Sequence, residues 1–334
     1  MAVDAVAPVP TRRPELTVVV PIYNEVENLL PLHGAITHAL APMGMDYEVL
    51  FVDDGSADGS HGRLLEIRSR DPHVRVIRFR RNFGQTPAMA AGFDHARGRL
   101  VVTMDGDLQN DPFDIPRLVH ELHHGDRGRG YDIVCGWRKD RQDARLSRLL
   151  PSFIANKLIA WATGVRIHDT GCTLKVYRDW VVKRLFLYSD MHRFIPALAA
   201  GAGARVGELP VRHHARRYGR SKYGITRVVR VLFDLIAVKM IVQFSAHPIR
   251  WFALCSMPFV LASNALFLWG LIKFSREAAP KLVERWDVEI MAAALVTGIV
   301  AVNLFLLGLL CELAVNTSGV LVRRTARTLR EAST

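Results

Sequence analysis

Apolar positions along the chain follow two patterns, and the change between them comes near residue 225. Before that point, short apolar runs alternate with longer stretches whose apolar residues recur every three or four positions. The short runs predict buried strands, and the longer stretches predict helices. We expect strands at residues 16–20, 47–52, 74–79, 100–104 and 132–136, and helices over 25–40, from about 58, and near 86–96. This alternation predicts an α/β domain whose mainly parallel sheet carries helices on both faces.

The second pattern consists of two long apolar runs near the C-terminal end. No residue is charged from Phe252 to Ile272 or from Ile290 to Cys311. Each run is long enough to cross a hydrocarbon core of about 30 Å as a helix. A buried helix of a large soluble protein is the alternative. Two such runs joined by a short charged loop favour a transmembrane hairpin, with helices at about 252–274 and 288–313.

These patterns divide the chain into five segments. Residues 1–14 have no long apolar run of the kind found in a secretory signal and predict a flexible tail. The α/β domain is expected over 15–224, followed by an amphipathic juxtamembrane helix in the membrane interface at 225–250. The two transmembrane helices then occupy 251–315, and a basic tail covers 316–334.

Charge suggests the partners and the orientation. The chain has 44 Lys and Arg against 32 Asp and Glu, a net charge of +12. This excess suggests nucleic acid, phosphate ligands or an anionic membrane surface as partner. Basic residues flank the outer ends of both spans, so both termini and the α/β domain are expected in the cytoplasm, at the inner membrane. The four widely spaced cysteines predict neither a zinc site nor a disulfide framework.

Polar residues follow three of the predicted strands. In parallel sheets, ligands bind beyond the carboxyl ends of the strands, so one site is expected to collect all three clusters. A G-x-G-x-x-G turn and a P-loop are both absent, so another device must hold any nucleotide. The clusters contain Pro21, Tyr23 and Glu25 after the first strand, Asp53 after the second, and Asp105, Gly106, Asp107 and Gln109 after the fourth.

The acids of the third cluster, Asp105 and Asp107, repel each other unless something lies between them. Mg²⁺ or Mn²⁺ prefers oxygen ligands and is commonly held by one or two carboxylates together with substrate phosphates. The alternative is a solvated acidic turn, or helix capping by Asp111 and Asp114 just beyond. The position after a buried strand, beside two other polar strand ends, favours a metal site.

Five stretches together resemble one known family: "VVVPIYNEVENL", "FVDDGSADGS", "RNFGQTPAMAAGFDHARG", "TMDGDLQNDP" and "RYGRSKYG". In order and spacing they are similar to the family-two glycosyltransferases that act on polyprenyl phosphates, of the dolichol-phosphate mannose synthase-like, two-span bacterial type. The resemblance covers about residues 15 to 250. It implies a GT-A fold for the cytoplasmic catalytic domain, a UDP- or GDP-linked sugar donor, a divalent metal, and undecaprenyl or dolichyl phosphate as acceptor.

The resemblance also implies roles for particular residues. The implied donor-binding residues are Pro21, Tyr23, Glu25, Asp53, Asp105, Gly106, Asp107 and Gln109. The implied metal ligands are Asp105, Asp107 and Gln109. The implied acceptor phosphate-binding residues are Arg138, Arg148, Arg216, Ser221 and Lys222. The implied catalytic residues are Asp105, Asp107, Arg138 and Arg216, in a transfer that inverts the sugar carbon.

A processive polysaccharide synthase, which adds sugar to a hydroxyl group, is the second hypothesis. Such an enzyme needs a general base, for which Asp190 is the candidate. Its Q-x-x-R-W signature is only approached by "HPIRW" at 247–251, and its T-E-D signature is missing. A membrane-tethered binding protein without turnover is the third hypothesis.

The expected partners are the nucleotide sugar, polyprenyl phosphate, anionic membrane lipids and further copies of the same chain. Nucleic acid is not expected, because it would explain neither the paired acids nor the apolar spans. The sequence leaves open which sugar and which nucleotide the donor carries.

Overall fold

The computed structural model describes residues 13–139, 167–185, 187, 191–201, 203–215, 248–276 and 285–317. The chain separates into two compact units, Met1–Val242 and Gln243–Thr334, which are described one at a time. The amphipathic helix predicted at 225–250 lies outside the described residues except for its last three, which belong to the first helix of the second unit.

The first unit is built on a seven-stranded sheet with the strand order β3-β2-β1-β4-β6-β5-β7. β6 runs antiparallel to both of its neighbours, and the other six strands share one direction. The predicted α/β class and mainly parallel sheet are therefore confirmed. The strands are β1 (Leu16–Ile22), β2 (Tyr47–Asp53), β3 (Val74–Arg78), β4 (Leu100–Thr103), β5 (Ile133–Trp137), β6 (Lys175–Arg178) and β7 (Val206–Pro210).

Sequence analysis did not predict β6 and β7. β6 is four residues long and has a basic residue at each end, and β7 contains Gly207 and ends at Pro210. Neither shows the run of three or more apolar residues that is present in β1, β2, β4 and β5. Pairing with neighbours supplies what their own sequences lack, since β6 is hydrogen-bonded on both sides by β4 and β5.

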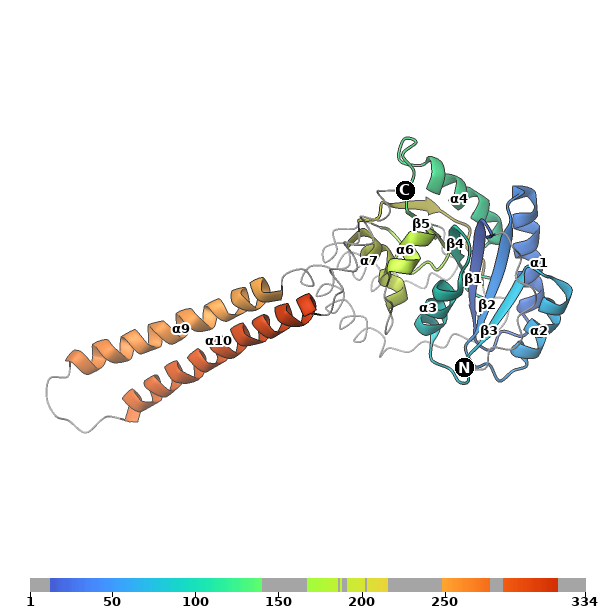
Figure 1. The fold of residues 1–334 in the computed structure, drawn as a ribbon. Coiled ribbons are helices and arrows are strands. Elements are labelled where there is room, and N and C mark those ends of the chain that lie inside the picture. Colours follow the sequence, from blue (N-terminus) through green and yellow to red (C-terminus); the bar gives the residue numbers. More distant parts are fainter. Residues whose placement is uncertain are drawn as a thin grey trace. The chain divides into compact units, whose positions relative to one another are not determined.

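Helices cover both faces of the sheet, as Figure 1 shows. One face carries α1 (Leu29–Leu40), α2 (Ser60–Arg70) and α4 (Ile115–His124), and the other carries α3 (Gln85–His95), α6 (Asp179–Arg184) and α7 (Ile195–Gly201). Short 3₁₀ helices lie at η1 (Ala41–Met43), η2 (Pro112–Asp114) and η3 (Met191–Phe194). The sheet is thus the middle layer of three.

Burial on both faces explains why the strands read as unbroken apolar runs. In β1, Val18 and Val20 point into the core that packs against α1, α2 and α4. Val19 points the opposite way, into a second core with Met89 and Phe93 of α3. Successive side chains of a strand alternate between faces, so both sets must be apolar.

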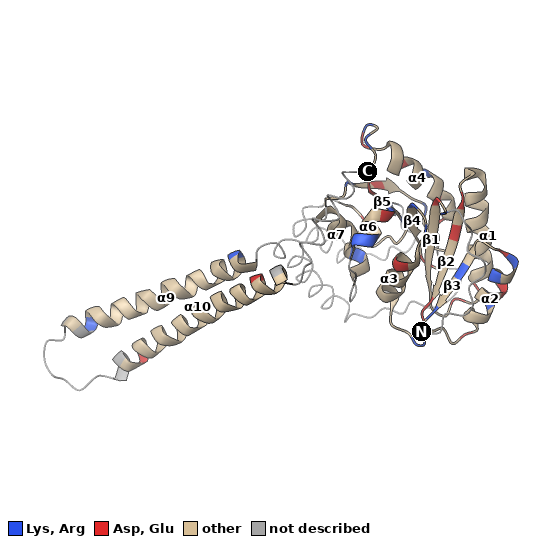
Figure 2. Ribbon diagram, viewed as in Figure 1, with Lys and Arg blue, Asp and Glu red and all other residues tan. Residues whose placement is uncertain are grey.

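The second unit is a pair of long helices, α9 (Pro248–Arg276) and α10 (Arg285–Thr317). Both are long and apolar enough to cross a membrane, with mean hydropathies of 1.7 and 2.5 in 18-residue windows within Pro248–Lys273 and Val288–Val315. Figure 2 shows their charged residues only toward the helix ends. Large apolar side chains are exposed along both helices, for example Leu261 and Leu295, which is not what a core helix of a soluble protein shows.

The two helices contact each other through small and polar residues. The Ser263 hydroxyl of α9 donates a hydrogen bond to the Ala294 carbonyl of α10 at 2.7 Å. At the start of α9, the backbone N–H of Ile249 donates to the Glu312 carboxylate at 3.2 Å. An acidic side chain is favourable there, because the first N–H groups of a helix have no partner within it.

Candidate active site

The three strands that are followed by polar clusters, β1, β2 and β4, are parallel neighbours and end along one edge of the sheet. Ile22 of β1 lies opposite Asp53 of β2, and Val19 of β1 lies opposite Thr103 of β4. Backbone hydrogen bonds extend this pairing past the strand ends, from Asp54 N–H to the Ile22 carbonyl at 2.8 Å. The structure therefore brings together the three clusters that follow these strands.

Asp105 is held by three side chains that sequence analysis did not single out. The Gln85 amide donates to Oδ1 of Asp105 at 2.8 Å, and the Thr173 hydroxyl donates to Oδ2 at 2.7 Å. The Asn110 side-chain oxygen accepts from the Asp105 backbone N–H at 3.1 Å. These three side chains, two donors and one acceptor, come from α3, the loop before β6 and the loop after β4, so only the tertiary structure assembles them.

The charge of Asp105 is strongly influenced by its neighbours. Burial and the adjacent Asp107 carboxylate raise the pKa of Asp105 to about 6, against the lowering effects of the Thr173 hydrogen bond and the positive charges of Arg138 and Lys175. Asp107 is itself only 6% exposed, and one of its oxygens accepts the Gln109 backbone N–H at 3.2 Å. Two enclosed carboxylates this close favour a cation between them.

The turn between the two acids is tight. A Cβ atom on Gly106 would lie 2.5 Å from Cδ1 of Ile22 and 3.3 Å from the Pro21 carbonyl oxygen, so a side chain here would require the Ile22 side chain to shift. Leu108, the residue after Asp107, has a φ of 61°, a conformation that is uncommon for residues other than glycine. Strained backbone of this kind clusters at functional sites, where the surrounding structure holds it in place.

Asp53 has a buried oxygen without a hydrogen-bond partner among the described residues. Its side chain is fully buried, Oδ1 accepts the Ser56 backbone N–H at 2.9 Å, and Oδ2 has no hydrogen bond. The nearest basic groups to Oδ2 are the His61 ring at 3.4 Å and the Arg78 guanidinium at 3.7 Å. Buried polar atoms are nearly always hydrogen-bonded, so this oxygen suits a ligand N–H or O–H donor.

The other residues predicted from the first cluster surround β1's end. Pro21 belongs to β1 itself, opposite Val52. Tyr23 and Glu25 follow it and are half-buried. The Glu25 backbone N–H donates to the Ser60 hydroxyl at 3.0 Å, which ties this turn to the start of α2.

Asp54 sets the position of α3. Its carboxylate accepts the backbone N–H groups of Phe83 at 2.7 Å and Gly84 at 2.8 Å. Burial raises the pKa of Asp54 despite these two hydrogen bonds, which lower it. Because Gly84 directly precedes α3, Asp54 fixes the helix start from which Gln85 reaches Asp105.

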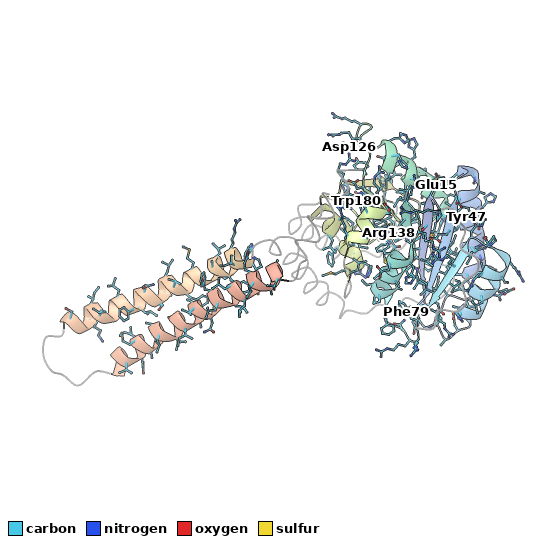
Figure 3. All side chains as sticks on the ribbon, viewed as in Figure 1. Glu15, Tyr47, Phe79, Asp126, Arg138 and Trp180 are labelled. Atoms are coloured by element: carbon cyan, nitrogen blue, oxygen red, sulfur yellow. The ribbon has the colours of Figure 1, made fainter. Side chains whose placement is uncertain are left out.

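Arg138 follows β5 and is labelled in Figure 3. Its Nε and Nη2 atoms donate to the two oxygens of Asp169 at 2.7 and 3.0 Å. Both side chains are largely buried, with 14% and 11% exposed. Burial alone would lower the pKa of Arg138, but the hydrogen bonds and charge of Asp169 raise it above its ordinary value. The predicted phosphate ligand therefore already has a carboxylate partner.

The remaining predicted acceptor residues, Arg148, Arg216, Ser221 and Lys222, lie outside the described residues, as does Asp190. Within the described ranges, no group of three or more His, Cys, Asp or Glu side chains is arranged to hold a metal ion. The carboxylate pair of Asp105 and Asp107 is compatible with a Mg²⁺ or Mn²⁺ ion that takes its other oxygen ligands from a bound diphosphate.

Lys175 is a buried basic residue that sequence analysis missed. It lies in β6 opposite Thr103 and is 2% exposed. Its ammonium group donates to the backbone carbonyls of Cys172 and, at 3.5 Å, Thr170. It thereby secures the loop that carries Thr173 to Asp105. The only sequence signal was a polar stretch, "HDTGCTLK", before a short apolar pair.

Comparison with known proteins agrees with this fold. The chain matches glycosyl transferase family 2 over residues 17–186 and belongs to that family. A glucosyl-3-phosphoglycerate synthase from Mycobacterium tuberculosis, solved with Mn²⁺, UDP and glucosyl-3-phosphoglycerate, has a similar structure with a TM-score of 0.50. The match is 17% identical and covers 69% of this chain and 80% of that one, so it shows the fold alone. The expected GT-A fold is confirmed.

Two relatives are similar in sequence. The dodecaprenyl-phosphate galacturonate synthase of Rhizobium johnstonii is 44% identical over 269 residues, which cover 79% of this chain and 78% of that protein. The undecaprenyl-phosphate 4-deoxy-4-formamido-L-arabinose transferase of Shewanella sediminis is 41% identical over 223 residues, 66% of this chain and 65% of that protein. The resemblance to the polyprenyl-phosphate members of the family is thereby confirmed.

Proposed function

We propose that this protein is an enzyme that transfers a sugar from a nucleotide diphosphate to a polyprenyl phosphate. The observation that carries the proposal is the pair Asp105 and Asp107 at the end of β4, in a family 2 chain. Both relatives described above are named for a dodecaprenyl or undecaprenyl phosphate. The names also suggest galacturonate and 4-deoxy-4-formamido-L-arabinose as the first donor sugars to try.

The nucleoside end of the donor is assigned to the edge formed by β1 and β2. The Oδ2 atom of Asp53, which has no hydrogen bond among the described residues, would accept one from the base or the ribose. Pro21, Tyr23 and Glu25, at the neighbouring end of β1, would line the same side. A buried carboxylate discriminates well, because a ligand that lacks the matching donor leaves it unpaired.

The diphosphate end is assigned to the loop after β4. Asp105, Asp107 and Gln109 would hold Mg²⁺ or Mn²⁺, and Gly106 leaves the loop free of a side chain beside β1. A bound divalent ion would stabilise the negative charge of the leaving diphosphate. The hydrogen bonds from Gln85 and Thr173 keep Asp105 in one orientation before substrate arrives.

The acceptor is itself the nucleophile. The second pKa of a phosphomonoester is about 6, so it is already an anion near neutral pH and needs no general base. The chain's task is to bring two anions together. Asp169 occupies Nε and Nη2 of Arg138, which leaves Nη1 for the acceptor phosphate. Arg148, Arg216, Ser221 and Lys222 are proposed as its other ligands, and inversion at the sugar carbon follows from direct displacement.

The second unit is proposed to anchor the enzyme in the inner membrane. α9 and α10 would span it, with the catalytic unit and both termini in the cytoplasm, in line with the basic residues that flank the spans. The basic stretch at 211–230 would attract anionic lipid head groups at about 1 kcal/mol per residue near the surface. Assembly into a homo-oligomer stays a prediction.

Transfer to a defined acceptor tests the function. Purified full-length protein in vesicles that contain undecaprenyl phosphate would be given UDP-galacturonate and other UDP- and GDP-linked sugars, with Mg²⁺ or Mn²⁺. We expect one donor to yield a lipid-linked monosaccharide together with UDP or GDP. Transfer only to a sugar hydroxyl acceptor would favour the polysaccharide synthase. Absence of turnover with every donor would favour the binding protein.

A further inference from the structure

The segment that follows β7, residues 211–215, lies against the loop after β4. β7 is parallel to β5, and β5 and β4 both run opposite to β6, so β7 ends at the same edge of the sheet as β4. The His214 backbone N–H donates to the Gln109 carbonyl at 2.9 Å. His213 and Asn110 form an isolated antiparallel bridge beside it. The loop of the proposed metal ligands is therefore paired with a segment about a hundred residues further along the chain.

Arg212 provides the side-chain part of this connection. Its Nε atom lies 3.2 Å from Oδ2 of Asp111, and its Nη2 atom lies 3.4 Å from Oδ1 of Asp114. Its backbone N–H donates to Oδ2 of Asp114 at 2.7 Å. Asp111 also caps η2 by accepting the Phe113 backbone N–H at 3.0 Å. The helix-capping role considered from the sequence for Asp111 and Asp114 therefore applies to Asp111, whereas Asp114 makes no side-chain cap hydrogen bond to α4.

The two acids are buried, which makes their basic partner consequential. Asp114 is 0% exposed and Asp111 is 6% exposed. Loss of Arg212 would leave Asp111 with the His214 ring at 3.2 Å and Asp114 with Arg117 at 2.8 Å as described basic neighbours, so part of the buried negative charge would be uncompensated and would disturb the surrounding backbone. For Asp111 that backbone leads within two residues to Gln109.

The same loop is held from its other side. The Asn110 side-chain oxygen accepts the Asp105 backbone N–H at 3.1 Å and the Thr173 hydroxyl at 3.0 Å. A shift of residues 109–111 would therefore disturb the backbone on both sides of Asp107. Groups that orient metal ligands without touching the metal commonly change metal affinity when they are replaced.

We infer that Arg212 is a positioning residue for the metal–diphosphate site. It binds Asp111 and Asp114 and thereby keeps Asp107 and Gln109 where they can hold a divalent cation against the donor's diphosphate. This inference rests on the proposed function.

Arg117 provides a matched control. It donates to Oδ1 of Asp114 at 2.8 Å, and its side chain is 53% exposed against 54% for Arg212. It belongs to α4 and, among the described residues, its hydrogen-bond and ion-pair partner is Asp114 and not Asp111. Arg212→Ala and Arg117→Ala therefore remove one guanidinium each from the same carboxylate, but only the first removes the connection to Asp111.

The test is Mn²⁺ binding to full-length protein in detergent, in the presence of UDP or GDP. The electron paramagnetic resonance signal of the free ion measures the binding. We expect Arg212→Ala to raise the half-saturating Mn²⁺ concentration by about 10-fold, the lower end of the effect of such orienting groups. Arg117→Ala should change it less than twofold. Arg212→Lys keeps the charge without the two-pronged geometry and should fall between them. The Mn²⁺ concentration for half-maximal transfer should shift in the same order.

Equal shifts in Arg212→Ala and Arg117→Ala, or no shift in Arg212→Ala, would overturn the inference. If Arg212→Ala unfolds at a lower temperature than wild type, Arg212→Lys decides in its place. An Arg212→Lys protein with wild-type Mn²⁺ binding and wild-type melting would then exclude a role for the geometry. Wild-type protein that binds no Mn²⁺ with either UDP or GDP would instead contradict the proposed metal role, and the wild-type measurement alone identifies that case.

Discussion

At the scale of single residues, the carboxylates at the sheet edge divide into two kinds. The carboxylates of Asp54, Asp111 and Asp114 accept hydrogen bonds from backbone N–H groups or pair with arginines, and these contacts hold loops in place. Asp53 retains a buried oxygen without a hydrogen bond, and Asp105 is crowded by Asp107. Only the second kind has unsatisfied bonding capacity or charge for a ligand to meet, so these are the residues assigned to the donor.

Replacement of Asp107 by alanine should abolish transfer and leave the catalytic unit folded. The side chain sits in a strand-end loop rather than among the apolar cores, so its loss opens no cavity in them. We expect activity with either Mg²⁺ or Mn²⁺ to fall at least about 100-fold, because even groups that only orient metal ligands cost 10–100-fold. The measurement is the initial rate at matched thermal unfolding. The exposed Asp94 of α3, changed to alanine, is the control.

Asp71 gives a prediction about pH and stability. Burial would raise the pKa of Asp71, but hydrogen bonds from His73 and His33 outweigh it, and its pKa is lowered. The stability that these contacts supply is therefore present above the ordinary carboxyl pKa of about 4 and is lost as the pH falls through the lower folded-state pKa. Asp71→Asn should lower the unfolding free energy by about 1 kcal/mol at pH 7.

The measurement is denaturant unfolding of wild type and Asp71→Asn from pH 7 down to pH 3. The two curves should converge toward the acid end of this range. A gap that stays constant across the range would show that the asparagine change acts through packing and not through the charge of Asp71.

At the scale of elements, the packing of α3 on the sheet connects stability to the site. A Cβ atom on Gly92 would overlap Cγ1 of Val19 in β1. The start of the same helix carries Gln85, which bonds Asp105. The close approach of Gly92 to β1 near the end of α3 therefore helps to set the position of Gln85 at the start of the same helix.

Gly92→Ala should destabilise the catalytic unit by about 1–3 kcal/mol, as overpacking of a filled core does. Adding Val19→Ala should restore part of the loss, because it removes the atoms that clash. Gly62 of α2 is the matched control, since a Cβ there meets nothing within 4 Å. Gly62→Ala should be neutral or slightly stabilising. Equal destabilisation by both changes would contradict the assigned contact. Thermal and denaturant unfolding are the measurements.

At the scale of the whole molecule, a catalytic unit and an apolar helix pair belong to one chain. Polyprenyl phosphate has a polar head and a hydrocarbon tail, so an enzyme that acts on it must work at a membrane surface. A GT-A unit with two apolar helices after it suits that requirement. The two relatives named for such acceptors agree with it.

The proposed orientation can be tested by cysteine labelling. A cysteine at Ala279, between the two spans, should react with a membrane-impermeant maleimide added to cells whose outer membrane is permeabilised. A cysteine at Ser333 in the C-terminal tail should react only after the inner membrane is opened. The background would carry Cys255→Ser and Cys311→Ser, which are the native thiols that are not buried. The opposite labelling pattern would place the catalytic unit outside the cytoplasm.

Five of the seven strands of the sheet can be predicted from the sequence by itself. The strands β1 to β5 were predicted within two residues at each end. For β1, β2, β4 and β5 the reason is that strands buried on both faces need apolar runs. Polar residues directly after such runs must lie at the sheet edge, so Asp53, Asp105 and Asp107 were found without coordinates. The two apolar spans are equally local, since a segment's length and lack of charge do not depend on its neighbours.

The tertiary structure decided everything that depends on residues far apart in the chain. β6 and β7 form only because strands from elsewhere pair with them. Gln85 and Thr173 donate hydrogen bonds to Asp105, which lies 20 and 68 positions away from them in the sequence. Arg138, expected to meet the acceptor, has Asp169 as its partner. A local pattern states which side chains are polar, but hydrogen bonds and ion pairs depend on distances of a few ångströms that folding alone determines.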